Sequence, residues 1–253
     1  MQTTARFHRK KLLFAVWATL IALDVAGLIW NGVRLGTNAI DFAKFSHVLM
    51  HFFISLGTIS AVFLAEYVFR FRVSVPLAIC CCIFAFCANT ISNVFCMYDY
   101  FRRWDKILHS VSGILFAVIG LGLALLLVKN QPDGKRKVLT VVLIAFLIVL
   151  AEGYLWEMFE FTVDTVDVNS NTQGWMDGLV QIGANGEYQI PDGMYLTSLR
   201  RGGAILDTMS DLILNFAGGL LFLIPCLVLF LKDTSRMQIF AFTTLPGSKK
   251  SKE

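Results

Sequence analysis

The sequence lacks three features that would each place it in a well-known class of protein. All six cysteines lie within or at the ends of apolar runs, which argues against a disulfide-bonded extracellular framework. No polar segment combines clustered Arg and Lys with aromatic residues, so nothing supports a nucleic-acid partner. No internal repeat or low-complexity linker is visible, and a single membrane domain over residues 1–253 is the simplest organisation.

Long apolar runs are what the sequence has instead. Hydrophobic residues make up 56% of the chain, and the runs have the length of about 20 residues that a helix needs to cross a bilayer. We therefore predict an all-α membrane protein, a polytopic bundle of about six transmembrane helices. The predicted spans lie near residues 12–33, 46–69, 75–97, 105–128, 138–163 and 204–231.

The basic residues predict the orientation of these spans. With a cytoplasmic N-terminus, 15 of the 22 Lys and Arg residues fall on the inside and 7 on the outside. The positive-inside rule therefore predicts that both termini are cytoplasmic, in a multi-pass protein of the cell membrane. The net charge of +4 is explained by this topology and by attraction to anionic lipids in the bilayer. The first span contains Asp24 and has no small-residue cleavage site, so it is expected to be retained.

The segment 164–203 joins the last two spans and is rich in Asn, Asp and Gly. It is too long for a simple connection, and we expect an extracytoplasmic loop or cap over the outer face. Within it, Asp167-Val-Asn169-Ser-Asn171 resembles the start of a calcium-binding loop, but no Glu stands at the twelfth position. A solvated turn is the favoured interpretation.

Ionisable residues inside the apolar spans are the strongest functional signal, because charge in lipid is costly. At 1.5 Å per residue, His51, His109, Glu157 and Asp211 all lie within about 10 Å of the outer ends of their spans. They are therefore expected to share one layer of the membrane. Asp24 and Glu152 lie nearer the middle of their spans and are expected either to support this layer from beneath or to pair with Asn or Trp groups.

Helical spacing gives these residues a direction as well as a depth. Residues three or four apart lie on one helix face, and such stripes are expected to face one another or a water-filled cavity rather than lipid. Glycines in the fourth and sixth spans would allow close helix approach below the polar layer. The stripes are His47 and His51; Asp105 and His109; Glu157, Glu160 and Asp164; and Asp207, Asp211 and Asn215.

Imidazoles and carboxylates in one layer are compatible with three kinds of chemistry. They can ligate a divalent metal ion, act as acid and base without a metal, or relay protons in a transporter. Asp105 and Asp207 lie at helix ends, where acids are often simply solvated; His109, Glu157 and Asp211 lie deeper. Our candidates are His109, Glu157, Glu160 and Asp211 as catalytic residues, Asp105, His109, Glu157, Asp207 and Asp211 as metal ligands, and Asn215, His47 and His51 as supporting residues.

Three short motifs in order resemble those of YjdF-like and VanZ-like bacterial membrane proteins. The resemblance covers about residues 98–222. It implies a multi-pass plasma-membrane protein with a family-level link through VanZ to glycopeptide tolerance, but no particular reaction. The segment 164–203 is longer than in YjdF-like chains, and this insert is expected to alter which molecules reach the polar layer. The motifs are Trp104-Asp105-Lys106-Ile107-Leu108-His109 with Gly113, then Glu157 with Glu160, then Asp207-Thr208-Met209-Ser210-Asp211 with Asn215 and Gly218-Gly219.

Two classes of function remain open. One is a cell-envelope enzyme, dependent on a metal or on acid and base groups, that acts on a lipid-linked or phospholipid substrate at the outer leaflet. The alternative is a transporter or non-catalytic protein that binds an ion or solute with the same cluster. An enzyme needs a laterally open cleft, whereas a transporter needs a polar path that continues inward toward Asp24, Glu152 and Glu66.

Overall fold

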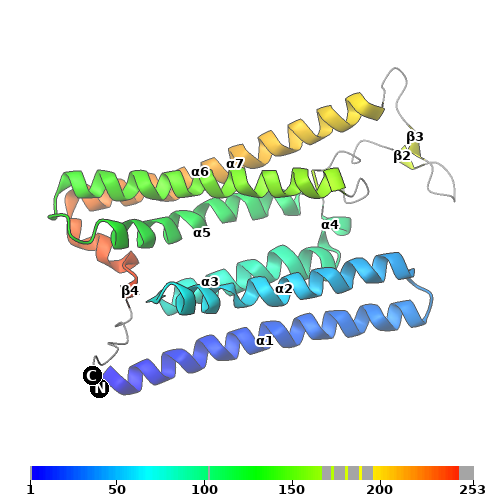
Figure 1. The fold of residues 1–253 in the computed structure, drawn as a ribbon, viewed down its shortest axis with the longest axis horizontal. Helices are drawn as coiled ribbons and strands as arrows, with labels where there is room; N and C mark the ends of the chain where they lie inside the picture. The colour runs from blue at the N-terminus through cyan, green and yellow to red at the C-terminus, as the bar shows by residue number, and fades with distance from the viewer. Residues whose placement is uncertain are drawn as a thin grey trace, which may run out of the picture.

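The computed structural model describes residues 2–101, 103–166, 172–173, 180–181, 188–189 and 196–244. Two groups of three helices lie side by side (Figure 1). The N-terminal bundle comprises α1 (Gln2–Gly36), α2 (Phe42–Val68) and α3 (Val75–Phe86), which continues as a π-helix, η1 (Cys87–Val94). The C-terminal bundle comprises α5 (Trp104–Leu127), α6 (Lys135–Val166) and α7 (Leu196–Lys232).

Short elements complete the fold. A single helical turn, α4 (Met97–Tyr100), joins the bundles, and a 3₁₀ helix, η2 (Thr234–Phe240), follows α7. The strand β1 (Phe71–Arg72) pairs antiparallel with β4 (Thr243–Thr244), so the end of the described chain returns to the N-terminal bundle. Near the other end of the molecule, β2 (Val180–Gln181) pairs antiparallel with β3 (Tyr188–Gln189).

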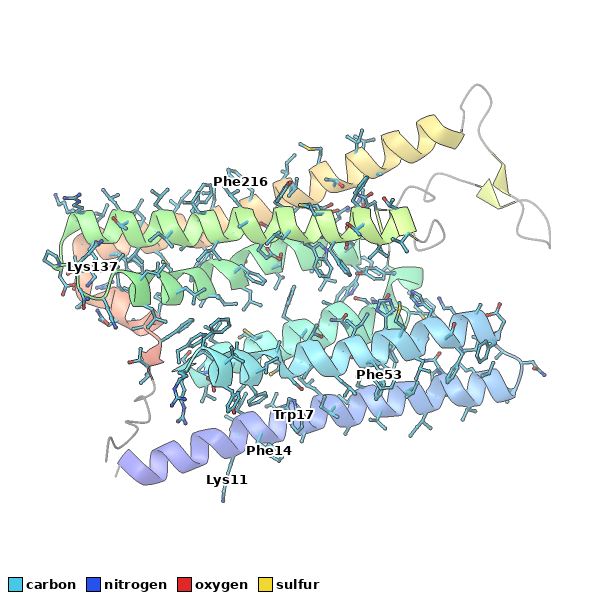
Figure 2. The ribbon with its side chains drawn as sticks, in the orientation of Figure 1. Lys11, Phe14, Trp17, Phe53, Lys137 and Phe216 are labelled. Atoms are coloured by element: carbon cyan, nitrogen blue, oxygen red, sulfur yellow. The ribbon has the colours of Figure 1, made fainter. Side chains whose placement is uncertain are left out.

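In the described part of the chain, six helices are long and apolar enough to cross a membrane, which confirms the predicted fold class. Their outward surfaces carry large apolar side chains, including Phe14 and Phe53, each more than half exposed (Figure 2). Such surfaces are typical of contact with lipid. The spanning segments are Lys11–Gly36, Phe42–Val68, Val75–Val94, Trp104–Leu127, Lys135–Val166 and Gly203–Lys232.

Several span ends differ from the sequence expectation by three or four residues. The end of the third span and the start of the last helix differ for local reasons. The third span ends at Val94 rather than near 97, because its last turns are a π-helix and Cys96 then adopts a left-handed conformation (φ 57°). The last helix begins at Leu196, well before the predicted residue 204, so α7 extends beyond its apolar run.

Glycines bring the backbones of α5 and α7 into direct contact, as the sequence predicted. A Cβ atom added at Gly113 would lie 2.0 Å from the carbonyl oxygen of Asn215, and one added at Gly218 would lie 2.2 Å from that of Ser110. Below this contact, apolar residues such as Leu121, Val141 and Leu223 fill the core of the bundle. The C-terminal bundle is thus closely packed beneath the level of Gly113.

The two bundles meet at both ends. Phe242 packs with Leu77 of α3 and Leu115 of α5, and its ring stacks on Phe71 at 5.2 Å. At the opposite end, the indole nitrogen of Trp104 donates a hydrogen bond to the Ser92 hydroxyl of η1 (2.8 Å). The start of α5 is therefore fixed against the π-helix.

We expect Gly113→Val to unfold the protein or to lower its free energy of unfolding by about 3 kcal/mol, because the side chain must displace the α7 backbone. Gly57→Ala on α2 is the matched control, since its Cβ meets nothing within 4 Å. Thermal unfolding in detergent distinguishes the two. Equal stability of both variants would contradict the backbone contact.

Candidate functional site

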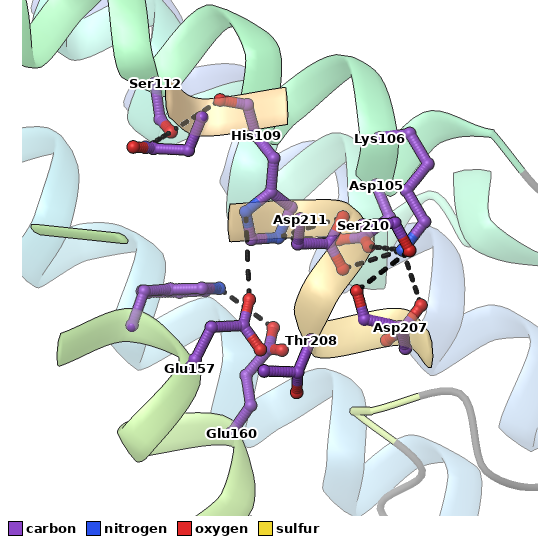
Figure 3. A network of polar contacts seen from close by, with 12 residues as sticks. Asp105, Lys106, His109, Ser112, Glu157, Glu160, Asp207, Thr208, Ser210 and Asp211 are labelled. Carbon is purple, nitrogen blue, oxygen red and sulfur yellow. Dashed lines mark hydrogen bonds and ion pairs between the residues drawn. The ribbon is translucent and has the colours of Figure 1, made fainter. Parts of the chain in front are cut away.

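The polar residues of the C-terminal bundle converge at the end of the molecule that lies away from β1 and β4 (Figures 1 and 3). The first two turns of α5 supply Asp105, Lys106 and His109, the late part of α6 supplies Glu157 and Glu160, and α7 supplies Asp207 and Asp211. The four-residue steps on α5 and α7 turn each set toward the other helices. The structure therefore gathers these seven side chains into one cluster, which we call the acidic site.

His109 lies at the centre of the acidic site and is only 6% exposed. Its Nδ1 lies 4.0 Å from an oxygen of Glu157. Its Nε2 lies 3.5 Å from Asp105 and 3.9 Å from Asp211. The imidazole thus faces carboxylates from all three helices.

Lys106 is the residue that sequence reasoning missed. Its ammonium nitrogen lies 2.5 Å from Asp207, 2.6 Å from Asp211 and 3.4 Å from Asp105. In the charge count, Lys106 was one of the seven basic residues assigned to the outside. Its position beside Asp105 in the Trp-Asp-Lys motif was the available signal. Lys106 is directed toward the two aspartates of α7, and three residues further along α5 His109 lies among carboxylates from all three helices.

Negative charge is in excess in the acidic site. Five carboxyl groups face one ammonium and one imidazole, and Glu157, Glu160 and Asp211 are all buried. Within the part of the chain that the structure describes, both oxygens of Glu157 and Oδ1 of Asp211 are buried without a hydrogen-bond partner. Buried carboxylate oxygens of this kind need a cation or a proton.

Among the described residues, three overlapping sets of side chains have ligand atoms within 4.8 Å of one another. The set Asp105, Asp207 and Asp211 already holds the ammonium of Lys106. The set His109, Glu157 and Asp211 is wholly buried and includes the unpaired oxygens. The third set is Asp105, His109 and Glu160. The second set is the best candidate for a metal ion, because Lys106 binds only Oδ2 of Asp211 and leaves Oδ1 and both Glu157 oxygens without a hydrogen-bond partner among the described residues.

Hydrogen bonds close the floor of the acidic site. The Asn215 amide donates to Glu152 (2.6 Å) and to the Ser112 hydroxyl (2.9 Å). Ser112 in turn donates to the backbone carbonyl of His109 (2.9 Å). Glu152 thus pairs with an Asn side chain, one of the two roles expected for it, and the Asn215 bonds lie beneath the acidic site.

Side chains also order the outer rim. The indole of Trp156 donates to Glu160 (2.8 Å). Asp164 accepts hydrogen bonds from the backbone amides of Thr172 and Gln173, and the Gln173 amide donates to Thr208 of α7 (2.9 Å). This part of the predicted cap thus joins α6 to α7 above the acidic site.

Tyr98 on α4 lies outside the spanning segments and is a second residue that sequence reasoning missed. Although the residue is 38% exposed, loss of hydration at its hydroxyl raises the pKa of Tyr98, and the carboxylates of Asp105, Glu160 and Asp211 add to the rise. Tyr98 therefore remains a neutral hydrogen-bond donor beside the acids at neutral pH.

Several candidates lie elsewhere. His47 and His51 are on α2, with ring centres 4.4 Å apart, and α2 packs on α1, α3 and η1 rather than on the C-terminal bundle. Asp24 also belongs to the N-terminal bundle, where it accepts a hydrogen bond from Thr90, so it does not lie beneath the acidic site. The calcium-like segment 167–171 lies outside the described residues.

The fold and the lipid-facing surfaces define a multi-pass α-helical membrane protein. Residues 15–232 match the family model described as "Predicted membrane protein (DUF2238)", and the chain belongs to this family. No curated protein and no solved structure matches the chain.

We expect Lys106→Met to lower the free energy of unfolding by about 2 to 3 kcal/mol, because it leaves Asp207 and Asp211 without their charged donor. Adding Asp211→Asn should recover part of this loss, since the buried negative charge is then removed. Thermal unfolding of the single and double variants measures the effect. Arg236→Met is the control: its partner Asp233 is exposed, so the melting temperature should not change.

Proposed function

We propose that this protein is a metal-dependent enzyme of the cell envelope that acts on a lipid-linked or phospholipid substrate at the outer leaflet. The observation that carries the proposal is the set of buried donors His109, Glu157 and Asp211, in which three carboxylate oxygens have no hydrogen-bond partner among the described residues. A divalent ion bound there would satisfy all three. The resemblance to YjdF-like and VanZ-like proteins supports an envelope location.

The donor set suits an ion that accepts nitrogen and oxygen ligands, such as Zn²⁺ or Mn²⁺. His109 would bind through one ring nitrogen: its Nδ1 faces Glu157, and its Nε2 faces Asp105 and Asp211. Such an ion would polarise a phosphoryl or acyl oxygen and lower the pKa of bound water. Glu160, held by Trp156 beside His109, is placed to accept or donate a proton.

A lateral groove supports a lipid substrate. It lies between α6 and α7, has a volume of about 270 Å³ and is lined by Leu150, Leu212, Ile213 and Phe216, with Asn215 as its polar residue. Asn215 follows Asp211 by one helical turn, so the groove lies immediately below the acidic site. An acyl chain in the groove would place an attached headgroup beside His109, Glu157 and Asp211.

The floor favours an enzyme over a transporter. Beneath Asn215 and Glu152, the described core of the C-terminal bundle is apolar and includes Ala117, Val149 and Leu223. Gly219 packs there against Val149, and an added Cβ would lie 2.7 Å from its side chain. This packing leaves no polar path from the acidic site through the described part of this bundle, as ion transport would require.

Metal analysis of the purified protein tests the proposal. We expect about one divalent ion per chain in the native protein and its loss in His109→Ala and Glu157→Gln, because each removes one of three ligands. Asp164→Asn is the matched control, since Asp164 holds the backbone of residues 172 and 173. A native protein without metal, or metal retained in both ligand variants, would contradict the metal site.

Filling the groove tests the substrate class. We expect Ile213→Trp to reduce the amount of co-purified phospholipid while the metal content stays unchanged, because the indole occupies the space of an acyl chain. Leu221→Trp on the lipid-facing side of the same helix is the control, as Leu221 is 72% exposed. Native mass spectrometry measures the bound phospholipid and the bound metal of each variant. Equal lipid in the two variants would argue against the groove as a lipid site.

A further inference from the structure

A second polar cluster lies in the N-terminal bundle and takes no part in the acidic site. Asp24 of α1 is fully buried, and its Oδ1 accepts a hydrogen bond from the Thr90 hydroxyl of η1 (2.8 Å). The Thr90 oxygen lies 2.7 Å from the Ser55 hydroxyl of α2. Three helices thus each contribute one side chain to this cluster, and all three residues are fully buried.

The other oxygen of this carboxyl group is unpaired. Oδ2 of Asp24 is buried and has no hydrogen-bond partner among the described residues. Apolar side chains such as Leu20, Ile59 and Phe86 fill the bundle core on one side of it. An ionised carboxylate is costly in such surroundings unless each oxygen is paired, whereas a proton on Oδ2 removes the charge.

The hydrogen-bond directions define a chain of donors. Because the Thr90 hydroxyl donates to Asp24, the Ser55 hydroxyl donates to Thr90. His51 precedes Ser55 by one turn on the same helix face, and its Nδ1 is buried without a hydrogen-bond partner in the described part of the chain. The ring of His47 lies beside that of His51. A polar stripe therefore runs along α2 from the end of the helix to the buried acid.

A π-helix lies at the centre of this arrangement. Thr90 belongs to η1, and irregular helical turns of this kind frequently mark functional positions. Two residues further on, Ser92 accepts the hydrogen bond from Trp104. Asp24 therefore lies level with the start of α5, at the same end of the molecule as the acidic site.

In the described part of the chain, the other ionisable groups on the helices packed around Asp24 form no hydrogen bond with it. On α2 they are Lys44, His47, His51, Glu66 and Tyr67, and on η1 it is Cys87. Arg34, on the same helix as Asp24, donates to Asn31 instead. No basic side chain is recorded as a partner of Asp24 among the described contacts.

We propose that Asp24 is a proton-binding site of the N-terminal bundle and that it exchanges its proton with the membrane surface through Thr90, Ser55 and the His51–His47 stripe. A proton that reaches the Ser55 oxygen releases the Ser55 hydroxyl proton to Thr90, and Thr90 releases its own to Oδ1 of Asp24. Rotation of the carboxyl group then exchanges its two oxygens, so that the proton lies on the oxygen that accepts no hydrogen bond. Both hydroxyls then rotate back to their starting direction. The step conserves protons and requires no other reactant, and it is independent of the metal site.

Infrared spectroscopy of the full-length protein tests the bound proton. At neutral pH, the native spectrum minus that of Asp24→Asn should contain the carbonyl band of a protonated carboxyl group. Thr90→Val should shift this band to higher frequency, because the carbonyl loses its hydrogen bond, and this variant retains Asp24 if the Asn variant fails to fold. A missing difference band together with an unshifted Thr90→Val spectrum would show that Asp24 is ionised and overturn the proposal.

Exchange into D₂O tests the route. Thr90→Val should slow the isotope shift of the Asp24 band by about tenfold or more, the effect of removing one hydrogen bond of 1 to 2 kcal/mol from the path. Ser60→Ala is the matched control. The Ser60 hydroxyl lies on α2, the helix of Ser55, but it accepts a hydrogen bond from Trp17 and lies outside the chain of donors. The route would be overturned if the Asp24 band of Thr90→Val shifted at the same rate as in the native protein, or if Thr90→Val and Ser60→Ala slowed the shift equally.

Discussion

The organisation of the C-terminal bundle depends on the neutralisation of negative charge at one end of it. Five carboxyl groups from three helices meet there, and Lys106 compensates Asp207 and one oxygen of Asp211. The remaining oxygens of Glu157 and Asp211 face His109 without hydrogen-bond partners in the described chain. A cation at this point would tie α5, α6 and α7 together, and the glycine contacts beneath it allow the helices to approach closely enough.

The two bundles differ in how they handle buried polar groups. In the C-terminal bundle, the Asn215, Ser112 and Glu152 hydrogen bonds form a floor above an apolar core. In the N-terminal bundle, Asp24, Thr90 and Ser55 form a chain that ends at an unpaired oxygen. The first arrangement suits chemistry confined to one membrane face, and the second suits movement of a proton. The Trp104–Ser92 hydrogen bond joins the two at the same level.

Much of this arrangement could be predicted from the sequence. Hydropathy predicts the six spans, and four-residue spacing together with depth brings His109, Glu157 and Asp211 to one layer. Depth does not determine lateral position, so it could not show that His47 and His51 lie in the other bundle. For the same reason Asp24 was expected beneath the site, although it belongs to the N-terminal bundle. Lys106 could not be predicted as an ion-pair centre, since a lysine at a helix end often extends to the interface.

X-ray absorption spectroscopy of the purified protein tests the central claim, that the excess charge is neutralised by a metal ion, most directly. We expect one imidazole nitrogen and several oxygen ligands, as His109, Glu157 and Asp211 would supply, and loss of the imidazole contribution in His109→Ala. A coordination shell of thiolates, or of oxygen alone and unchanged in that variant, would contradict a metal ion at this position.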